Sequence, residues 1–303
     1  MTLITTDFEQ PTTDDYPTRK GTEPALLYRR DPAVWGTAAD GPMSQEELDS
    51  FDTKGYYQAE ALVTAEELAI YRAELDRLAG DEAIKRDERT IVERSSDEVR
   101  SIFEVHKISE VFAKLVRDPR VVGRARQILG SDVYVHQSRV NYKPGFGGGD
   151  FYWHSDFETW HAEDGMPRPR AVSLSLALTD NHPYNGCLMI MPGSHKTYVS
   201  CVGETPEGHY RDSLKKQEIG TPDPSSLTIL ADKHGIDMIT GPAGTGLFFD
   251  CNCMHGSSGN ISPYPRSNVF IVFNSVDNTC GEPFAAPSPR PTFVGARDFT
   301  PVI

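Results

Sequence analysis

The chain carries few basic residues and no long apolar segment. Of its 303 residues, 30 are Lys or Arg and 44 are Asp or Glu, which gives a formal net charge of -14. The basic residues form no run longer than a pair such as Arg29-Arg30. A clustered basic surface for phosphate contacts is therefore missing, and we expect no nucleic-acid partner. No stretch of about 18 apolar residues occurs, so we also expect no membrane span and no membrane partner.

Cysteine is scarce as well, and its pattern bears on the compartment. The chain has five cysteines, an odd number that does not fit a disulfide framework in a protein of this length. The N-terminal stretch MTLITTDFEQPTTDDYPTRK also lacks the basic start and apolar run of a secretory signal. We therefore expect a cytoplasmic protein with reduced thiols.

Glycine and proline are abundant instead, with 25 and 22 residues. Many turns favour a β-rich body over a helical bundle, and the length suits a single domain around one large core. The expected parts are an extended N-terminal arm (1–42), a mainly helical part (43–130), a β core (131–285) and a C-terminal tail (286–303).

Helix signals fall in the first half of the chain. Ser44 precedes a glutamate by three residues, and so does Thr64, which is the capping-box pattern of helix N-termini. Asp118 followed by Pro119 predicts another helix start, and Gly130 predicts the end of that helix.

Strand signals fill the second half. Stretches rich in β-branched and aromatic residues predict strands, and they cover 132–143, 171–179, 187–195, 244–255 and 266–275. Residues 198–239 lie between two of them and are expected to form a lid or an insertion. Helices followed by a run of strands indicate an α+β chain, mainly β, built around a sandwich or barrel.

The stretch FYWHSDFETWHAEDGMP (151–167) offers candidate metal ligands. His154 and Asp156 would share a face if the stretch were a strand. His255 ends the strand-like run GTGLFFDCNCMH and could be the third ligand. Two histidines and one carboxylate form the ligand set of non-haem Fe(II) oxygenases. Arg266 could bind the distal carboxylate of a keto acid through its guanidinium fork, and Ser267 could add a hydrogen bond.

Several other interpretations remain open for these residues. The His154–Asp156 pair could be an exposed polar pair in a loop, and Glu158 could compete with Asp156 as a ligand. The C-x-C-x-H run of Cys251, Cys253 and His255 could bind zinc, although no second cluster completes a four-ligand site. Arg266 could pair with a surface acid, and Trp160 could be core packing. No role is evident for His161.

The constellation resembles the 2-oxoglutarate-dependent dioxygenases of the phytanoyl-CoA hydroxylase type. Within that family, FYWHSDFETWHAEDGMPRPRAVSLSLALTDNHPYNGCLMIMPGSH and CNCMHGSSGNISPYPRSNVFIVFNSVDN are similar to the signature blocks of the ectoine hydroxylases. The resemblance implies a double-stranded β-helix fold (jelly roll, cupin-like) with flanking helices, a cytoplasmic homodimer, Fe(II), and the co-substrates 2-oxoglutarate and O2. It also implies conversion of ectoine to 5-hydroxyectoine, with succinate and CO2 as by-products.

The resemblance also assigns roles to residues. It implies that His154, Asp156 and His255 ligate the metal and that Lys143 and Arg266 bind 2-oxoglutarate. Gln137 and Trp160 would contact ectoine. A Trp face suits the delocalised ring cation of ectoine through a cation–π attraction of about 0.5–2 kcal/mol. Phe103 and Phe273 are further candidates for the walls of the substrate site. The alternatives are a sister dioxygenase acting on another small polar metabolite, such as proline, and a non-catalytic cupin-like binding protein.

Overall fold

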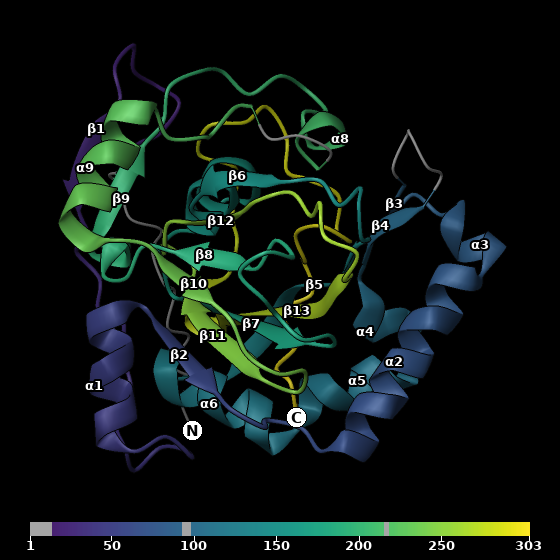
Figure 1. The fold of residues 1–303 in the computed structure, drawn as a ribbon. Helices are drawn as coiled ribbons and strands as arrows, with labels where there is room; N and C mark the ends of the chain where they lie inside the picture. Colours follow the sequence, from purple (N-terminus) through teal and green to yellow (C-terminus); the bar gives the residue numbers. More distant parts are fainter. Residues whose placement is uncertain (1–13, 93–97, 215–217) are drawn as a thin grey trace, which may run out of the picture.

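The structure is a computed structural model that describes residues 14–92, 98–214 and 218–303 (Figure 1). Two β-sheets occupy its centre, and helices from the first half of the chain lie along one side of them (Figure 1). None of the helices in these ranges is long and apolar enough to cross a membrane.

The larger sheet has seven strands in the described part of the chain, and every neighbouring pair is antiparallel. In spatial order the strands are β2 (Tyr56–Ala59), β11 (Gly246–Asp250), β7 (Ala171–Ala177), β13 (Arg266–Ser275), β5 (Val133–Lys143), β4 (Val99–Phe103) and β3 (Thr90–Val92). The fully buried β13 lies at the centre and pairs along its whole length with β5. These two long strands form the floor on which the site described below is built.

The smaller sheet faces the larger one. Its order is β10 (Asp237–Ile239), β8 (Leu188–Ile190), β12 (His255–Ser257) and β6 (Phe151–His154). Apolar side chains of both sheets, including Ile190, Phe249 and Phe270, form a common buried cluster. A separate pair, β1 (Ala25–Tyr28) with β9 (Thr197–Ser200), flanks them. Two antiparallel sheets packed face to face form a jelly roll, and the predicted fold class is confirmed.

Helices cover the outer face of the larger sheet. In chain order they are α1 (Gln45–Lys54), α2 (Ala65–Gly80), α3 (Glu82–Lys85), α4 (Val105–Ile108), α5 (Glu110–Arg117) and α6 (Pro119–Leu129). Both capping boxes are present, at Ser44 and Thr64. Asp118 caps α6, and Gly130 ends it with φ 59°, as the sequence predicts. α6 packs directly on β5, β7 and β13.

The part expected to be mainly helical also supplies strands. β2, β3 and β4 all lie within residues 43–130 and extend the larger sheet at both edges. Two predicted strands are shorter than expected, because 187–195 continues into the 3₁₀ helix η2 (Ser194–Lys196) and 244–255 is broken by a turn between β11 and β12. Such breaks depend on the neighbouring sheet and not on local composition.

The segment expected to be a lid or an insertion contains regular structure. Residues 198–239 include α8 (Tyr210–Ser213) and α9 (Pro224–His234), besides most of β9 and all of β10. Residues 215–217 of this segment lie outside the described residues, as do residues 1–13 of the arm. The remaining helical elements are α7 (Asp156–Thr159), the π-helix η1 (Trp160–Asp164) and the 3₁₀ helix η3 (Val276–Asn278).

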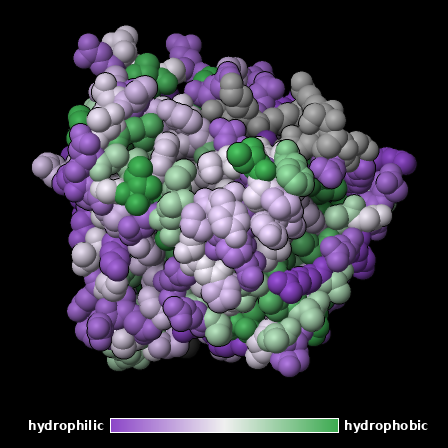
Figure 2. Space-filling model, in the orientation of Figure 1, coloured by the Kyte–Doolittle hydropathy of each residue, from purple (hydrophilic) through white to green (hydrophobic). Residues whose placement is uncertain are grey.

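The face in Figure 2 is mostly polar, with apolar side chains in small groups between hydrophilic ones. Large apolar side chains exposed in the described residues come from scattered positions, such as Tyr28, Phe146 and Ile261.

Candidate active site

Three candidate ligands meet at one edge of the smaller sheet. His154 ends β6, Asp156 begins α7, and His255 begins β12. β6 and β12 are neighbours, and their register sets His255 directly opposite His154. One ligand atom from each of the three side chains lies within 4.8 Å of the others. The Nε2 atoms of His154 and His255 are 3.7 and 3.9 Å from the Asp156 carboxylate.

The two imidazoles are oriented for metal binding. His154 Nδ1 donates to the Tyr152 carbonyl at 2.7 Å, and His255 Nδ1 donates to the Cys253 carbonyl at 3.0 Å. Because a carbonyl only accepts, each Nδ1 carries the proton and each Nε2 presents a lone pair toward Asp156. Burial, together with the neighbouring His255, lowers the pKa of His154 to about 4, so this ring is neutral at ordinary pH. The three residues fit a divalent ion that prefers nitrogen and oxygen ligands.

The local geometry differs from a continuous strand. The strand ends at His154, and Asp156 is already helical, so strand parity does not bring the pair together. The helix turns Glu158 away from the site, and its carboxylate pairs with Arg19. Glu158 therefore does not compete as a ligand. Among the described residues, His154, Asp156 and His255 form the one group that could hold a metal ion.

The structure does not support the zinc interpretation. Cys251 and Cys253 lie in the turn between β11 and β12, where strand parity does not apply. Cys251 packs in an apolar cluster, and the Cys253 thiol donates to the Gly55 carbonyl. Burial raises the pKa of both thiols, which keeps them protonated.

A cationic pocket adjoins the three ligands. It is lined by Lys143 from β5, Arg266 from β13 and Ser257 from β12, and no carboxylate lines it. Lys143 Nζ donates to Ser257 Oγ at 2.9 Å and to the Ser258 carbonyl at 2.6 Å, while Arg266 donates to the Gly186 carbonyl at 3.1 Å. Burial beside Arg266 lowers the pKa of Lys143 to about 7. Two buried cations in a pocket whose described lining holds no carboxylate suit a bound anionic carboxylate.

Ser267 does not take part in this pocket. Successive residues of a strand point to opposite faces, so Ser267 cannot share the face of Arg266. Its backbone is tied to Thr179 and Leu178 on the other strand edge, and its side chain does not line the pocket. The structure does not place Ser267 in this pocket, where the Ser257 hydroxyl lies beside Lys143 instead.

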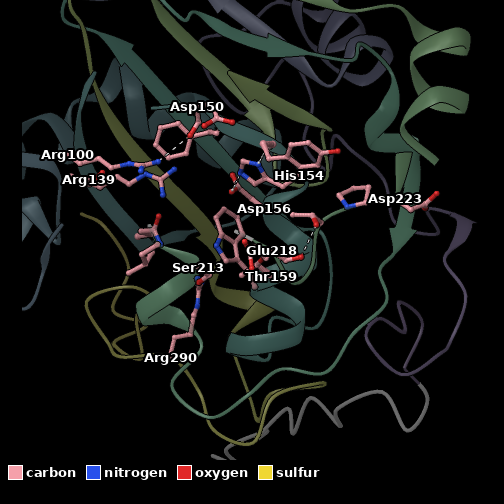
Figure 3. A pocket seen from close by; sticks show the side chains of 18 of the residues that line it. Arg100, Arg139, Asp150, His154, Asp156, Thr159, Ser213, Glu218, Asp223 and Arg290 are labelled. Atoms are coloured by element: carbon pink, nitrogen blue, oxygen red, sulfur yellow. Dashed lines mark hydrogen bonds and ion pairs between the residues drawn. The ribbon is translucent and has the colours of Figure 1, made fainter. Parts of the chain in front are cut away.

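A larger cavity of about 660 Å³ opens on the other side of the ligands. Gln137, Trp160 and Phe103 line it, together with His154 and Asp156. Gln137 Nε2 donates to the Val294 carbonyl at 2.6 Å. The Trp160 ring packs edge-on to His136 and leaves one side on the cavity. In Figure 3, Arg100 and Arg139 lie at the upper left of the cavity, and Ser213, Thr159 and Arg290 lie below them.

The structure does not place Phe273 at the cavity either. Its ring is fully buried among apolar residues of the helix-covered core and does not line the cavity. β13 pairs with β7 in unbroken register, so Phe273 shares the face of Val269 and Ile271, opposite that of Arg266. Phe270, on the inner face of the sheet, lines the cationic pocket instead.

Arg139 is a further candidate site residue, which the sequence motifs do not include. It lies between Gln137 and Lys143 on the same face of β5, and it lines both the cavity and the cationic pocket. Its guanidinium lies 4.9 Å from the centre of the Phe270 ring and 5.8 Å from that of Phe103. Burial lowers its pKa, and within the described part of the chain its Nε has no hydrogen-bond partner. Gln137, Arg139 and Lys143 are separated by even numbers of residues and therefore share one face of a strand. The same alternation, read from the sequence, could have identified Arg139.

Comparison with known proteins identifies a family, and close relatives include an enzyme and a solved structure. A model of the family phytanoyl-CoA dioxygenase (PhyH) matches residues 51–268. Ectoine dioxygenase of Streptomyces coelicolor is 62% identical over 303 residues, which cover 100% of both chains. The crystal structure of EctD from S. alaskensis with 2-oxoglutarate and 5-hydroxyectoine matches with a TM-score of 0.87 and 45% identity. It covers 96% of this chain and 97% of its own. A crystal structure of the same EctD with bound Fe has a TM-score of 0.87, 44% identity and the same coverage of both chains.

Proposed function

The chain belongs to the phytanoyl-CoA dioxygenase (PhyH) family, and we propose that it hydroxylates ectoine to 5-hydroxyectoine with consumption of 2-oxoglutarate and O2. The observation that carries the proposal is the convergence of two histidines and one carboxylate between a cationic pocket and a larger cavity. A relative that matches over the full chain is an ectoine dioxygenase, and a solved relative holds 2-oxoglutarate and 5-hydroxyectoine, which supports the same substrate and product here.

His154, Asp156 and His255 would hold Fe(II) in this enzyme. When bound with 2-oxoglutarate, Fe(II) supplies the O2-dependent oxidation, and the keto acid leaves as succinate and CO2. The residues of the chain contribute the preformed donor set. The backbone carbonyls of Tyr152 and Cys253 fix the tautomers and rotations of the two imidazoles.

Lys143 and Arg266 would bind the carboxylate of 2-oxoglutarate that does not reach the metal. Both are buried cations at the inner end of the pocket, and Ser257 is within hydrogen-bond distance of Lys143. A guanidinium fork matches a carboxylate with two parallel hydrogen bonds, and the ammonium adds a point charge. The anion would offset the burial and the repulsion from Arg266, which lower the pKa of Lys143 in the free protein.

Ectoine would occupy the larger cavity. Ectoine is a zwitterion with a carboxylate and a delocalised ring cation, so it needs groups of both kinds. We assign the cation to the face of Trp160 and the carboxylate to Arg139, whose buried Nε lacks another partner in the described residues. Gln137 would fix the ring by a hydrogen bond, and Phe103 would form a wall. These contacts would hold the substrate beside the metal ligands and exclude water.

We further propose that the enzyme is a homodimer of the cytoplasm. The support for the compartment is chemical: all five cysteines lie in the described residues, and each is an unpaired buried thiol. Multi-angle light scattering of the purified enzyme tests the dimer, and a monomeric mass at micromolar concentration would contradict it.

The decisive experiment measures stoichiometry. The purified protein with Fe(II), ascorbate and 2-oxoglutarate should form succinate and 5-hydroxyectoine in equal amounts when ectoine is present. His154→Ala should abolish both products, and the matched control His234→Ala, in α9 away from the site, should retain them. If a substrate panel shows a preference for proline, the protein is a sister dioxygenase with another substrate. If no substrate causes O2 uptake, the protein is a non-catalytic binding protein.

A further inference from the structure

The N-terminal arm contacts the helix that carries Asp156 and Trp160. Tyr16 packs edge-on to Phe157, with ring centres 5.2 Å apart. Asp14 accepts a hydrogen bond from His161 at 3.0 Å, and this contact strongly lowers the pKa of Asp14 against the effect of its burial. The arm is thus packed along α7 and η1 by apolar and charged contacts.

Arg19 is the centre of this contact. Its Nη2 and Nε atoms donate to the two carboxylate oxygens of Glu158 at 2.7 and 2.9 Å, and its Nη1 donates to Glu163 at 2.7 Å. Thr18 adds a hydrogen bond to Glu158 at 2.7 Å. The side chains of the three charged residues are between 0% and 3% exposed, so the network is shielded from water. The backbone of Arg19 adopts φ 57°, an uncommon conformation for a residue with a side chain.

The same helix presents its other side to the cavity. Asp156, Thr159 and Trp160 line the cavity, and Thr159 and Trp160 follow Asp156 by three and four residues, on one face of the helix. Glu158 and Glu163 are five residues apart, and the π-helical turn of η1 brings them to one side, toward Arg19. A movement of the two carboxylates would therefore move Trp160 and Asp156 with them.

Arg19 also contacts two stretches, 201–214 and 218–224, that contribute residues to the cavity lining. Its backbone N–H donates to the Cys201 carbonyl at 2.8 Å, and its Nη1 donates to Thr205 at 2.9 Å. In the second stretch, Gly220 has φ +74° and lies close to both charged groups. A Cβ at this position would lie 2.2 Å from Arg19 Nη2 and 2.4 Å from Glu158. The wall residues between and beside these contacts include Val202, Ser213, Leu214, Thr221 and Pro222.

We propose that Arg19 is a positioning residue for the substrate: it fixes the Trp160 helix and the cavity wall in one arrangement without touching ectoine. The inference rests on the proposed ectoine hydroxylation. Arg19 suits this task because one planar fork holds both oxygens of Glu158 while its remaining nitrogen holds Glu163. A lysine at this position keeps the charge but cannot make three directed bonds.

The test compares Arg19 with an equally buried arginine that lies outside the cavity. Arg29 pairs with Asp250 at 2.7 Å, and both side chains are 3% exposed. Arg19→Gln should raise the KM for ectoine by roughly ten- to hundredfold, since a displacement of about 1 Å in a site has effects of that size. It should also release succinate in excess of 5-hydroxyectoine. The KM for 2-oxoglutarate should change less than about twofold. Arg19→Lys should give values between those of the wild type and Arg19→Gln. Arg29→Gln should keep the wild-type KM values and the wild-type ratio of succinate to 5-hydroxyectoine.

Hydrogen–deuterium exchange of the metal-free protein gives a readout independent of turnover. Arg19→Gln should speed exchange in peptides from 156–164 and 202–214, and Arg29→Gln should leave those peptides as in the wild type. If Arg19→Gln does not fold, Glu163→Gln is the second variant, because it keeps both hydrogen bonds from Arg19 to Glu158. It should raise the KM for ectoine and the exchange rates in the same peptides by smaller amounts.

The outcomes separate the two proposals. A wild-type enzyme that turns over another substrate and not ectoine overturns the proposed function, whatever the variants do. A wild type active on ectoine, with Arg19→Gln matching Arg29→Gln in coupling, ectoine KM and exchange, overturns the positioning role alone.

Discussion

The charge of Lys143 makes the affinity for 2-oxoglutarate depend on pH. Burial and the nearby Arg266 lower the pKa of Lys143 from 10.5 to about 7 in the protein without ligand. The cation that attracts the carboxylate is therefore mostly present below pH 7 and mostly absent above it. 2-Oxoglutarate remains a dianion throughout this range, so the protonation of Lys143 controls the change.

The size of the effect follows from that pKa. One pH unit above a controlling pKa lowers the cationic fraction about tenfold, which corresponds to about 1.36 kcal/mol per unit. The apparent Kd for 2-oxoglutarate should therefore be nearly constant below pH 6.5 and rise about five- to tenfold per unit between pH 7 and 9.

Calorimetric titration of anaerobic Fe(II)-loaded protein with 2-oxoglutarate measures this slope. Lys143→Gln should bind weakly at every pH and lose the slope, while Lys233→Gln, on α9, should behave as the wild type. A flat Kd between pH 6 and 9 in the wild type, or an unchanged slope in Lys143→Gln, would refute the argument.

Four further substitutions test individual contacts. Ser257→Ala should raise the Kd for 2-oxoglutarate about two- to tenfold, the value of one hydrogen bond, whereas Ser267→Ala should leave it unchanged in the same titration. Arg139→Gln should raise the KM for ectoine at least about tenfold, because a charge-assisted bond contributes about 1.5–3 kcal/mol; an unchanged KM would remove Arg139 from the substrate site. Phe273→Ala should lower the free energy of unfolding by about 3–5 kcal/mol in urea denaturation, and a loss of ectoine affinity without loss of stability would contradict its place in the core.

Much of the local structure follows directly from the sequence. The capping boxes at Ser44 and Thr64 and the Asp118–Gly130 helix form as predicted, because cap hydrogen bonds and the left-handed glycine involve only neighbouring residues. The alternating stretch before Lys143 forms β5, since its side-chain pattern already fits a pleated strand. The fold class was predictable from the order of these elements, and the likeness to a known family added its topology.

The candidate ligands were predictable as a set, but for a reason that is only partly right. His154 and Asp156 were identified by assumed strand parity, and the structure shows a strand that ends between them. Parity over a few residues cannot reveal where a strand ends, because that depends on which partner strand continues beside it. Ser267 and Phe273 are a different case, because alternation along β13 already places both on the face opposite Arg266.

By itself, then, the sequence determines the caps, the strand-forming stretches and the residue types needed for iron and keto acid binding. The tertiary structure alone decides which of these residues meet. His255 reaches His154 through the register of β12 with β6, and Ser257 reaches Lys143 across two sheets. Arg19, in the N-terminal arm, reaches Glu158 across a separation of 139 residues. The physical reason is that hydrogen bonds within a helix or turn are set by neighbouring residues, whereas contacts between distant segments form only when the two sheets and the arm pack around a common core.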